Sequence, residues 1–160
     1  MGKVQLDKKV PDFEAASSSG KTFKLSDCKG KHLVLYFYPK DNTSGCTREG
    51  QDFRDNYNKF KRNKAIVVGV SRDSLKSHEN FIAKQEFPFN LLSDQDEALC
   101  TQFDVIKEKN MYGRKVMGIE RSTFLLGPDG KLRREWRKVK VAGHVDEVLE
   151  AVRELNRGNA

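Results

Sequence analysis

The chain has 160 residues, of which 37% are hydrophobic and 33% charged, and its net charge is +7. This length predicts a single domain over residues 1–160, and the mixed charge excludes an intrinsically disordered chain. No apolar run approaches the roughly 20 residues of a membrane span, and the N-terminus has no signal-peptide pattern.

The first third of the chain predicts a hairpin, a strand and a helix. Phe13 and the pair Phe23 and Leu25 flank a Ser-rich turn and predict a short N-terminal β-hairpin. Residues 32–38 are apolar at nearly every position, which indicates a buried central strand. Aromatic residues then recur at helical spacing, so a helix is expected from Cys46 to Arg62.

Strands and helices continue to alternate along the rest of the chain. The expected elements are a strand at 65–70, a helix at 74–85, a short strand at 90–93, a helix through Cys100 and Phe103 capped by Asp94 or Asp96, a polar turn-like stretch at 107–118, a strand at 119–126, a return strand at 131–141 and a final helix at 144–157. This order predicts an α/β three-layer sandwich with a mixed sheet and an N-terminal hairpin extension. Ligands of such sheets tend to bind at the carboxyl end of the central strand.

Cys46 lies at that position, directly after a turn of Asp, Asn, Thr, Ser and Gly. A thiol in the first turn of a helix faces unpaired backbone N–H groups and the positive end of the helix dipole, which favour the thiolate. A nucleophilic Cys46 is therefore the leading hypothesis. The structural alternative is a small buried side chain, which is the usual role of a free cysteine.

The segment Pro39-x-x-x-Thr43-x-x-Cys46 resembles the peroxiredoxin signature, and its flanking residues resemble the bacterioferritin comigratory protein, or peroxiredoxin Q, branch. The likeness extends over nearly the whole chain, including the segment 118–124 around Arg121. The resemblance implies a thioredoxin-like fold and a thiol peroxidase that reduces hydrogen peroxide and organic hydroperoxides.

The resemblance also assigns roles to four residues. Cys46 would be the peroxidatic cysteine, which becomes a sulfenic acid, and Arg121 the cation that stabilises its thiolate. Thr43 would offer its hydroxyl to the peroxide, and Pro39 would shield the pocket. Such chemistry needs an ionised sulfur and fixed donors aimed at both oxygens, and it requires neither a cofactor nor a metal.

The chain departs from this branch at three positions. Ser44 stands where the family usually has proline, and the two usual positions of a resolving cysteine hold Gln51 and Ile82. We therefore predict a 1-Cys mechanism, in which thioredoxin, glutaredoxin or glutathione reduces the sulfenic acid. Resolution by Cys28, which we expect to be exposed, or by Cys100, which we expect to be a buried structural thiol, remains open.

Other features were weighed as alternatives. A thioredoxin-like disulfide reductase lacks its second cysteine, because Glu49 occupies that position. The bases between Lys131 and Lys140 raise the possibility of a basic binding module, although a solvated strand face is favoured over nucleic-acid binding.

The three histidines are expected at a strand edge (His32), on a helix surface (His78) and at a helix start (His144), without a catalytic triad. Three widely spaced cysteines fit neither a disulfide framework nor a zinc site and favour the cytoplasm. The resemblance implies a monomer.

Overall fold

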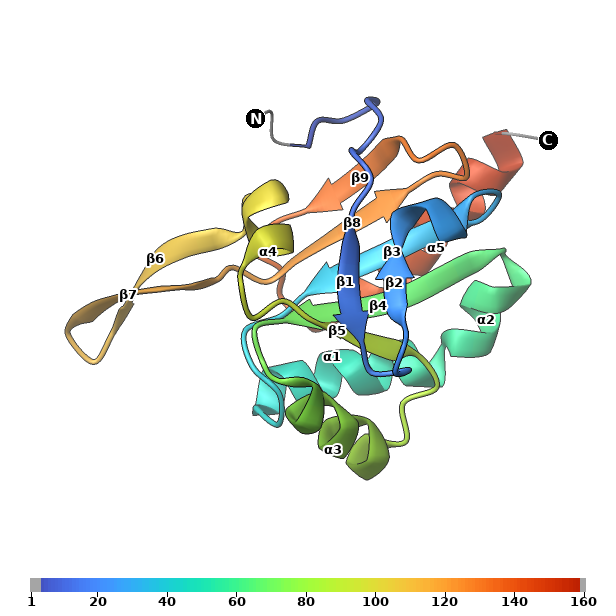
Figure 1. The fold of residues 1–160 in the computed structure, drawn as a ribbon. Helices are drawn as coiled ribbons and strands as arrows, with labels where there is room; N and C mark the ends of the chain where they lie inside the picture. Colours follow the sequence, from blue (N-terminus) through green and yellow to red (C-terminus); the bar gives the residue numbers. More distant parts are fainter. Residues whose placement is uncertain (1–3, 159–160) are drawn as a thin grey trace.

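A computed structural model describes residues 4–158 of the chain (Figure 1). Its elements, in chain order, are β1 (Glu14–Ser17), β2 (Thr22–Lys24), the 3₁₀ helix η1 (Leu25–Cys28), β3 (His32–Phe37), α1 (Ser44–Asp55), α2 (Tyr57–Arg62), β4 (Ala65–Ser71), α3 (Leu75–Gln85), β5 (Asn90–Ser93), α4 (Ala98–Gln102), β6 (Ile106–Met111), β7 (Arg114–Ile119), β8 (Ser122–Leu126), β9 (Leu132–Trp136) and α5 (His144–Gly158).

Seven of the strands form one mixed sheet in the order β2-β1-β5-β4-β3-β8-β9. Strands β3, β4 and β5 run parallel, whereas β8 pairs antiparallel with β3, and β1 pairs antiparallel with both β2 and β5. Every residue of β3 is buried, as expected for a central strand covered on both faces. The predicted mixed sheet and N-terminal hairpin are therefore confirmed.

Two apolar layers cover the faces of this sheet. Val34 and Tyr36 of β3 pack with buried side chains of α1, α2, α3 and α5. Leu33 and Leu35 face the other way and pack with η1 and α4, because successive side chains of a strand point to opposite faces. Among residues 4–158, no helix has the length and apolar character needed to cross a membrane.

The predicted helix from Cys46 to Arg62 is in fact two helices. Asn56 separates α1 from α2, and its side-chain amide donates to the carbonyl oxygen of Asp52 over 2.9 Å. An asparagine that bonds to the backbone in this way competes with the helical hydrogen-bond pattern. The prediction of one continuous helix was wrong for this reason.

The stretch 107–118, predicted to be turn-like, forms most of a separate two-stranded sheet of β6 and β7. Figure 1 shows this hairpin (yellow to orange) standing off the body of the molecule. Because most of its length faces solvent on both sides, it lacks the alternation of apolar and polar residues that identifies a half-buried strand.

The bounds of two strands also differ from the prediction. The return strand β9 stops at Trp136 rather than at Val141, and Lys138 adopts a left-handed conformation with φ of 51°. The strand predicted from Ile119 to Leu126 is interrupted, because Ile119 ends β7 and β8 begins only at Ser122. The residues between these strands leave the sheet, and one of them is Arg121.

Candidate active site

A short loop between β3 and α1 carries Pro39 and Thr43. Thr43 is the N-cap residue of α1, but its side chain makes no capping hydrogen bond. Its hydroxyl instead donates to the carbonyl oxygen of Lys40 over 2.8 Å. Asn42 completes the turn in a left-handed conformation with φ of 63°, which asparagine tolerates better than most residues. The Thr43 side chain thus closes the loop on itself.

Cys46 is the third residue of α1 and only 1% exposed. Its place in the first turn puts it where backbone N–H groups have no partner within the helix and where the helix dipole favours negative charge. The expectation that this cysteine follows the central strand and opens a helix is confirmed.

Arg121 reaches Cys46 from the gap between β7 and β8. Ser122 pairs with Phe37 at the end of β3, which places the residue before it beside the loop that leads to α1. The Nη2 atom of Arg121 donates to Cys46 Sγ over 3.4 Å. This contact joins the two residues that the family resemblance singled out.

Glu49 is a further member of the site. Its position in the sequence indicated only that a disulfide reductase is excluded. Its Oε1 atom accepts from Nη1 of Arg121 over 2.6 Å, so one guanidinium contacts both the thiol and the carboxylate. Glu49 is fully buried, and Oε2 has no hydrogen-bond partner. The spacing of three residues from Cys46 places both side chains on one helix face, and this was the available signal.

Burial and charge act in opposite directions on this pair. Burial raises the pKa of Glu49 to about 7, although the neighbouring Arg121 works against that rise. Burial disfavours the charge of Arg121 too, but the negative groups at Glu49 and Cys46 outweigh it and raise the pKa of the guanidinium. Arg121 is therefore a permanent cation, while Glu49 changes its charge near neutral pH.

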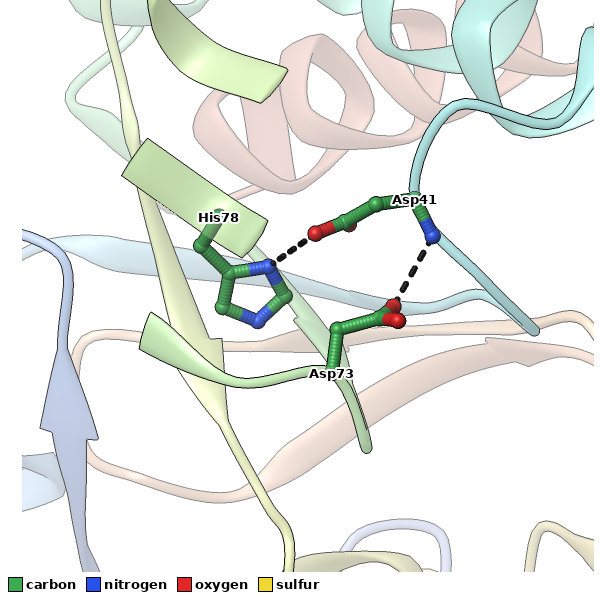
Figure 2. A group of neighbouring side chains, drawn as sticks. All are labelled: Asp41, Asp73 and His78. Carbon is green, nitrogen blue, oxygen red and sulfur yellow. Dashed lines mark hydrogen bonds and ion pairs between the residues drawn. The ribbon is translucent and has the colours of Figure 1, made fainter. Parts of the chain in front are cut away.

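A buried polar cluster anchors the same loop to α3 (Figure 2). Asp41 accepts from the hydroxyl groups of Tyr38 over 2.5 Å and Ser77 over 2.8 Å, and its backbone N–H donates to Asp73 over 2.8 Å. The Nδ1 atom of His78 lies 2.8 Å from Asp41 Oδ2. The loop is thus fastened to β3, to α3 and to the turn between β4 and α3.

His78 is fully buried, contrary to its predicted place on a helix surface. Its Nδ1 atom faces the Asp41 carboxylate and its Nε2 atom lies 2.9 Å from the carbonyl oxygen of Leu92. Both neighbours are hydrogen-bond acceptors, so the ring is held between Asp41 and Leu92 beneath the loop.

Among the described residues, one group could hold a metal ion by the type and closeness of its side chains. It consists of Asp41, Asp73 and His78. Hydrogen bonds already use the atoms that would bind an ion. Oδ2 of Asp41 accepts from Ser77, and Oδ2 of Asp73 accepts from the backbone of Asp41 and the hydroxyl of Ser71. These contacts indicate that the cluster is a hydrogen-bonded anchor for the loop rather than a metal site.

The other two cysteines are separated from Cys46 by the sheet. Cys28 precedes β3 and Cys46 follows it, and the six residues of β3 alone span about 20 Å. Cys100 packs in the apolar layer on the opposite face. Both thiols are buried. The expectation that Cys28 is exposed was therefore wrong, and the expectation that Cys100 is buried is confirmed.

Burial also reduces the reactivity of these two thiols. It raises the pKa of Cys28 to about 11, with a further contribution from Asp27. Burial and Asp94 raise the pKa of Cys100 well above its usual range. Neither thiol is therefore ionised near neutral pH.

The two positions without a resolving cysteine have structural roles. Gln51 on α1 donates to Gln85 on α3 over 2.9 Å, and Ile82 packs against the apolar layer below α1. Ser44 is the exposed first residue of α1.

The remaining histidines bond to partners other than Cys46. His32 is buried within the central strand β3, not at an edge, and bonds to Asn156. His144 begins α5, as predicted, and its Nε2 atom lies 2.8 Å from the Thr123 hydroxyl.

Half of the bases in the cluster between Lys131 and Lys140 are paired with acids. Its arginines form ion pairs with acids, namely Arg133 with Asp7 and Asp129, Arg134 with Glu154 and Arg137 with Glu135. This pairing favours the solvated strand face over a binding module.

Comparisons with known proteins agree with this geometry. Residues 6–135 match the model of the AhpC/TSA family. The chain belongs to this family. Peroxiredoxin Bcp of Xanthomonas campestris pv. campestris is 58% identical over 150 residues, which is 94% of each chain, and Peroxiredoxin Bcp of Bacillus subtilis is 48% identical over 153 residues, which is 96% of this chain and 98% of that one.

Solved structures extend the comparison to the fold. A structure of the Xanthomonas campestris bacterioferritin comigratory protein, concerned with its alkyl peroxide reduction activity, has a TM-score of 0.88 at 54% identity and covers 96% of this chain and 98% of that chain. A mutant of Xylella fastidiosa PrxQ has a TM-score of 0.90 at 46% identity, with the same coverage. These relatives confirm the predicted branch, the thioredoxin-like fold and the class of thiol peroxidase.

Proposed function

We propose that this peroxiredoxin reduces peroxides through Cys46 by a 1-Cys mechanism. The observation that carries the proposal is the 3.4 Å contact between Arg121 Nη2 and Cys46 Sγ at the first turn of α1. A guanidinium holds its charge at any physiological pH and so favours the thiolate permanently. A helix N-terminus adds donors without a proton of its own to titrate.

In the first half-reaction the Cys46 thiolate attacks one peroxide oxygen and the O–O bond breaks. The sulfur becomes a sulfenic acid, and the departing oxygen takes a proton and leaves as water or an alcohol. Negative charge develops on that departing oxygen, so the donors around Cys46 stabilise the transition state more than the ground state.

Arg121 is assigned two tasks, to stabilise the Cys46 thiolate and to stabilise the charge on the departing oxygen. It contacts the sulfur and is held in place by Glu49. Thr43 is assigned to the peroxide through its hydroxyl, whose bond to Lys40 fixes its position. Pro39, half-buried at the end of the central strand, is assigned to shaping and shielding the loop. No cofactor or metal is assigned.

In the second half-reaction an external thiol reduces the sulfenic acid. It condenses with Cys46 to a mixed disulfide and water, and a second thiol then releases the Cys46 thiolate. The burial of Cys28 and Cys100, on the far side of the sheet or at its other end, supports this mechanism. Thioredoxin, glutaredoxin and glutathione are the candidate donors.

The substrate class includes organic hydroperoxides as well as hydrogen peroxide. Support comes from the alkyl peroxide reduction activity named for the Xanthomonas campestris relative, which is 54% identical to this chain. Three unpaired cysteines fit a reducing compartment such as the cytoplasm. A monomer over the single domain 1–160 is the proposed state.

Stopped-flow oxidation by one equivalent of hydrogen peroxide tests the first half-reaction, with Cys46→Ser as the control. Wild type should lose one thiol rapidly, and the variant should not. Mass spectrometry of the product should find a sulfenic acid at Cys46. A disulfide between Cys46 and either Cys28 or Cys100 would refute the 1-Cys mechanism, and equal slow oxidation of both proteins would refute the peroxidase itself.

A further inference from the structure

The hairpin of β6 and β7 carries most of the unexplained apolar surface of the molecule. Of the five large apolar side chains that are exposed among the described residues, four lie on it: Met111, Tyr112, Val116 and Met117. A protruding ribbon with clustered apolar side chains is typical of an interaction surface.

The tip of the hairpin has a costly conformation. Tyr112 and Gly113 form the turn, and both adopt positive φ, 55° and 79°. Such a turn suits the twist of a hairpin, but a bulky residue rarely occupies its first position. The Tyr112 side chain is 100% exposed and thus packs against nothing in this chain. Its place is therefore better explained by contact with another molecule than by stability.

One face of the hairpin carries only basic and apolar side chains of its own, and one of these bases, Lys107, pairs with Asp104 over 3.3 Å. The pairing of Lys109 with Val116 and of Met111 with Arg114 places these four side chains on one face, together with Lys107. The only acid within the two strands, Glu108, pairs with Met117 on the other face. We call Lys107, Lys109, Met111, Arg114 and Val116 the basic face.

The basic face is continuous with the candidate active site. Lys109 packs along Gly118 and donates to the carbonyl oxygen of Ile119, two residues before Arg121. Burial and the charge of Arg121 lower the pKa of Lys109, which places its ammonium group within the field of the site. At the other strand, Arg72 donates to the carbonyl oxygen of Met117. A molecule seated on this face would therefore lie next to the segment that carries Arg121.

We propose that the basic face docks the reductant, and that the reductant is a protein with an acidic, partly apolar surface around its reactive thiols. This inference rests on the proposed 1-Cys mechanism. Each strand has six residues and spans about 20 Å, which exceeds the reach of a free tripeptide thiol bound at Cys46. A second copy of this chain would bring two basic faces together, and like charges oppose that contact.

The chemistry then involves two thiols of the docked protein. The first condenses with the Cys46 sulfenic acid, forming the mixed disulfide and releasing water. The second attacks the partner's own sulfur in that disulfide, so that the Cys46 thiolate leaves and the partner keeps an internal disulfide. The partner is oxidised by two electrons, which equals the reduction of one sulfenic acid. Docking through the hairpin leaves the space above Cys46 to the attacking thiol.

The test compares two hairpin variants, Met111→Asp/Arg114→Glu and Arg114→Glu alone, with the matched control Lys29→Glu/Lys31→Glu. The control bases are also exposed but lie before β3, at the opposite end of the sheet from Cys46. An acidic thioredoxin is the protein reductant, and dithiothreitol is a small neutral reductant that needs no docking.

The hairpin variants should raise the KM for thioredoxin by about tenfold at low salt, because charges at an interface rim mainly set the association rate. Their single-turnover oxidation by hydrogen peroxide and their turnover with dithiothreitol should equal those of wild type and the control. Unchanged KM values for thioredoxin, or turnover of wild type with glutathione but not with thioredoxin, would overturn the proposal.

Failure of the proposed function has a separate signature. If wild-type Cys46 does not react with peroxide in a single turnover, the peroxidase itself is refuted, whatever the hairpin does. Two further measurements examine other occupants of the face. A wild-type dimer in sedimentation velocity that the hairpin variants dissociate, or binding to phosphatidylglycerol vesicles that they abolish, would overturn docking of a reductant.

Discussion

Glu49→Gln should remove a pH dependence of stability that originates in the active site. Burial raises the pKa of Glu49 from 4.5 to about 7 in the folded chain. The folded state therefore holds a proton that the unfolded state has released, and this contribution to stability is complete below pH 4.5 and lost as the pH rises through 7. A difference of about 2.5 pKa units corresponds to about 3 kcal/mol.

Urea unfolding under reducing conditions at pH 4.5, 5.5, 6.5 and 7.5 measures the effect. Glutamine keeps the acceptor for Arg121 but cannot ionise, so the variant should gain about 3 kcal/mol relative to wild type between pH 4.5 and 7.5. With a slope near 2 kcal/mol per molar urea, the difference between the two midpoints should change by roughly 1.5 M. A constant offset from the buried amide does not affect this change.

A pH-independent difference between the two proteins would refute the reasoning. It would mean that Arg121 keeps Glu49 ionised in the folded chain, so that its pKa is close to that of the unfolded chain. The activity of the variant is a second readout. Arg121 would lose its charged partner, and single-turnover oxidation of Cys46 should slow by about tenfold, in line with the loss of one charge-assisted contact.

Two more substitutions test the frame around the site. Asp41→Asn should destabilise the chain by about 3 kcal/mol, because it leaves His78 without its charged partner. The variant should also oxidise more slowly at Cys46. Unchanged urea unfolding would show that the cluster does not anchor the loop. Gly50→Ala should lower the melting temperature by about 3–6 °C, since the added Cβ would lie 2.3 Å from the Phe87 ring. Helix propensity alone predicts a higher melting temperature, and that result would contradict this packing.

The parts of the fold that sequence reasoning predicted well are those with a strong local pattern. β3 and β4 are apolar runs in the middle of the sheet, where packed layers cover both faces, and α5 carries one continuous apolar stripe. The hairpin of β6 and β7 was missed because it buries little on either side, so its strands have no apolar periodicity. Asn56 was missed because its effect depends on one side-chain hydrogen bond.

The candidate site was predictable as a set of residues, but not as a network. Cys46 follows from its place after the central strand, and Arg121 came only from the family resemblance, since nothing local links two residues so far apart. Glu49 was not recognised as a site residue, and His78 was wrongly placed on a helix surface, because a charged or polar side chain on a helix is usually solvated. Their burial results from partners on other elements, Arg121 and Asp41.

The separation of the three thiols by the sheet has a consequence for how the enzyme survives oxidative stress. In the proposed 1-Cys mechanism neither Cys28 nor Cys100 resolves the Cys46 sulfenic acid, so the lifetime of that acid would be set by how soon an external donor arrives. A second peroxide competes for the same sulfur and carries it to the irreversible sulfinic acid. The fraction of enzyme inactivated in each cycle should therefore follow the ratio of peroxide to reduced donor. The loss of activity would then report the redox state of the solution around the enzyme.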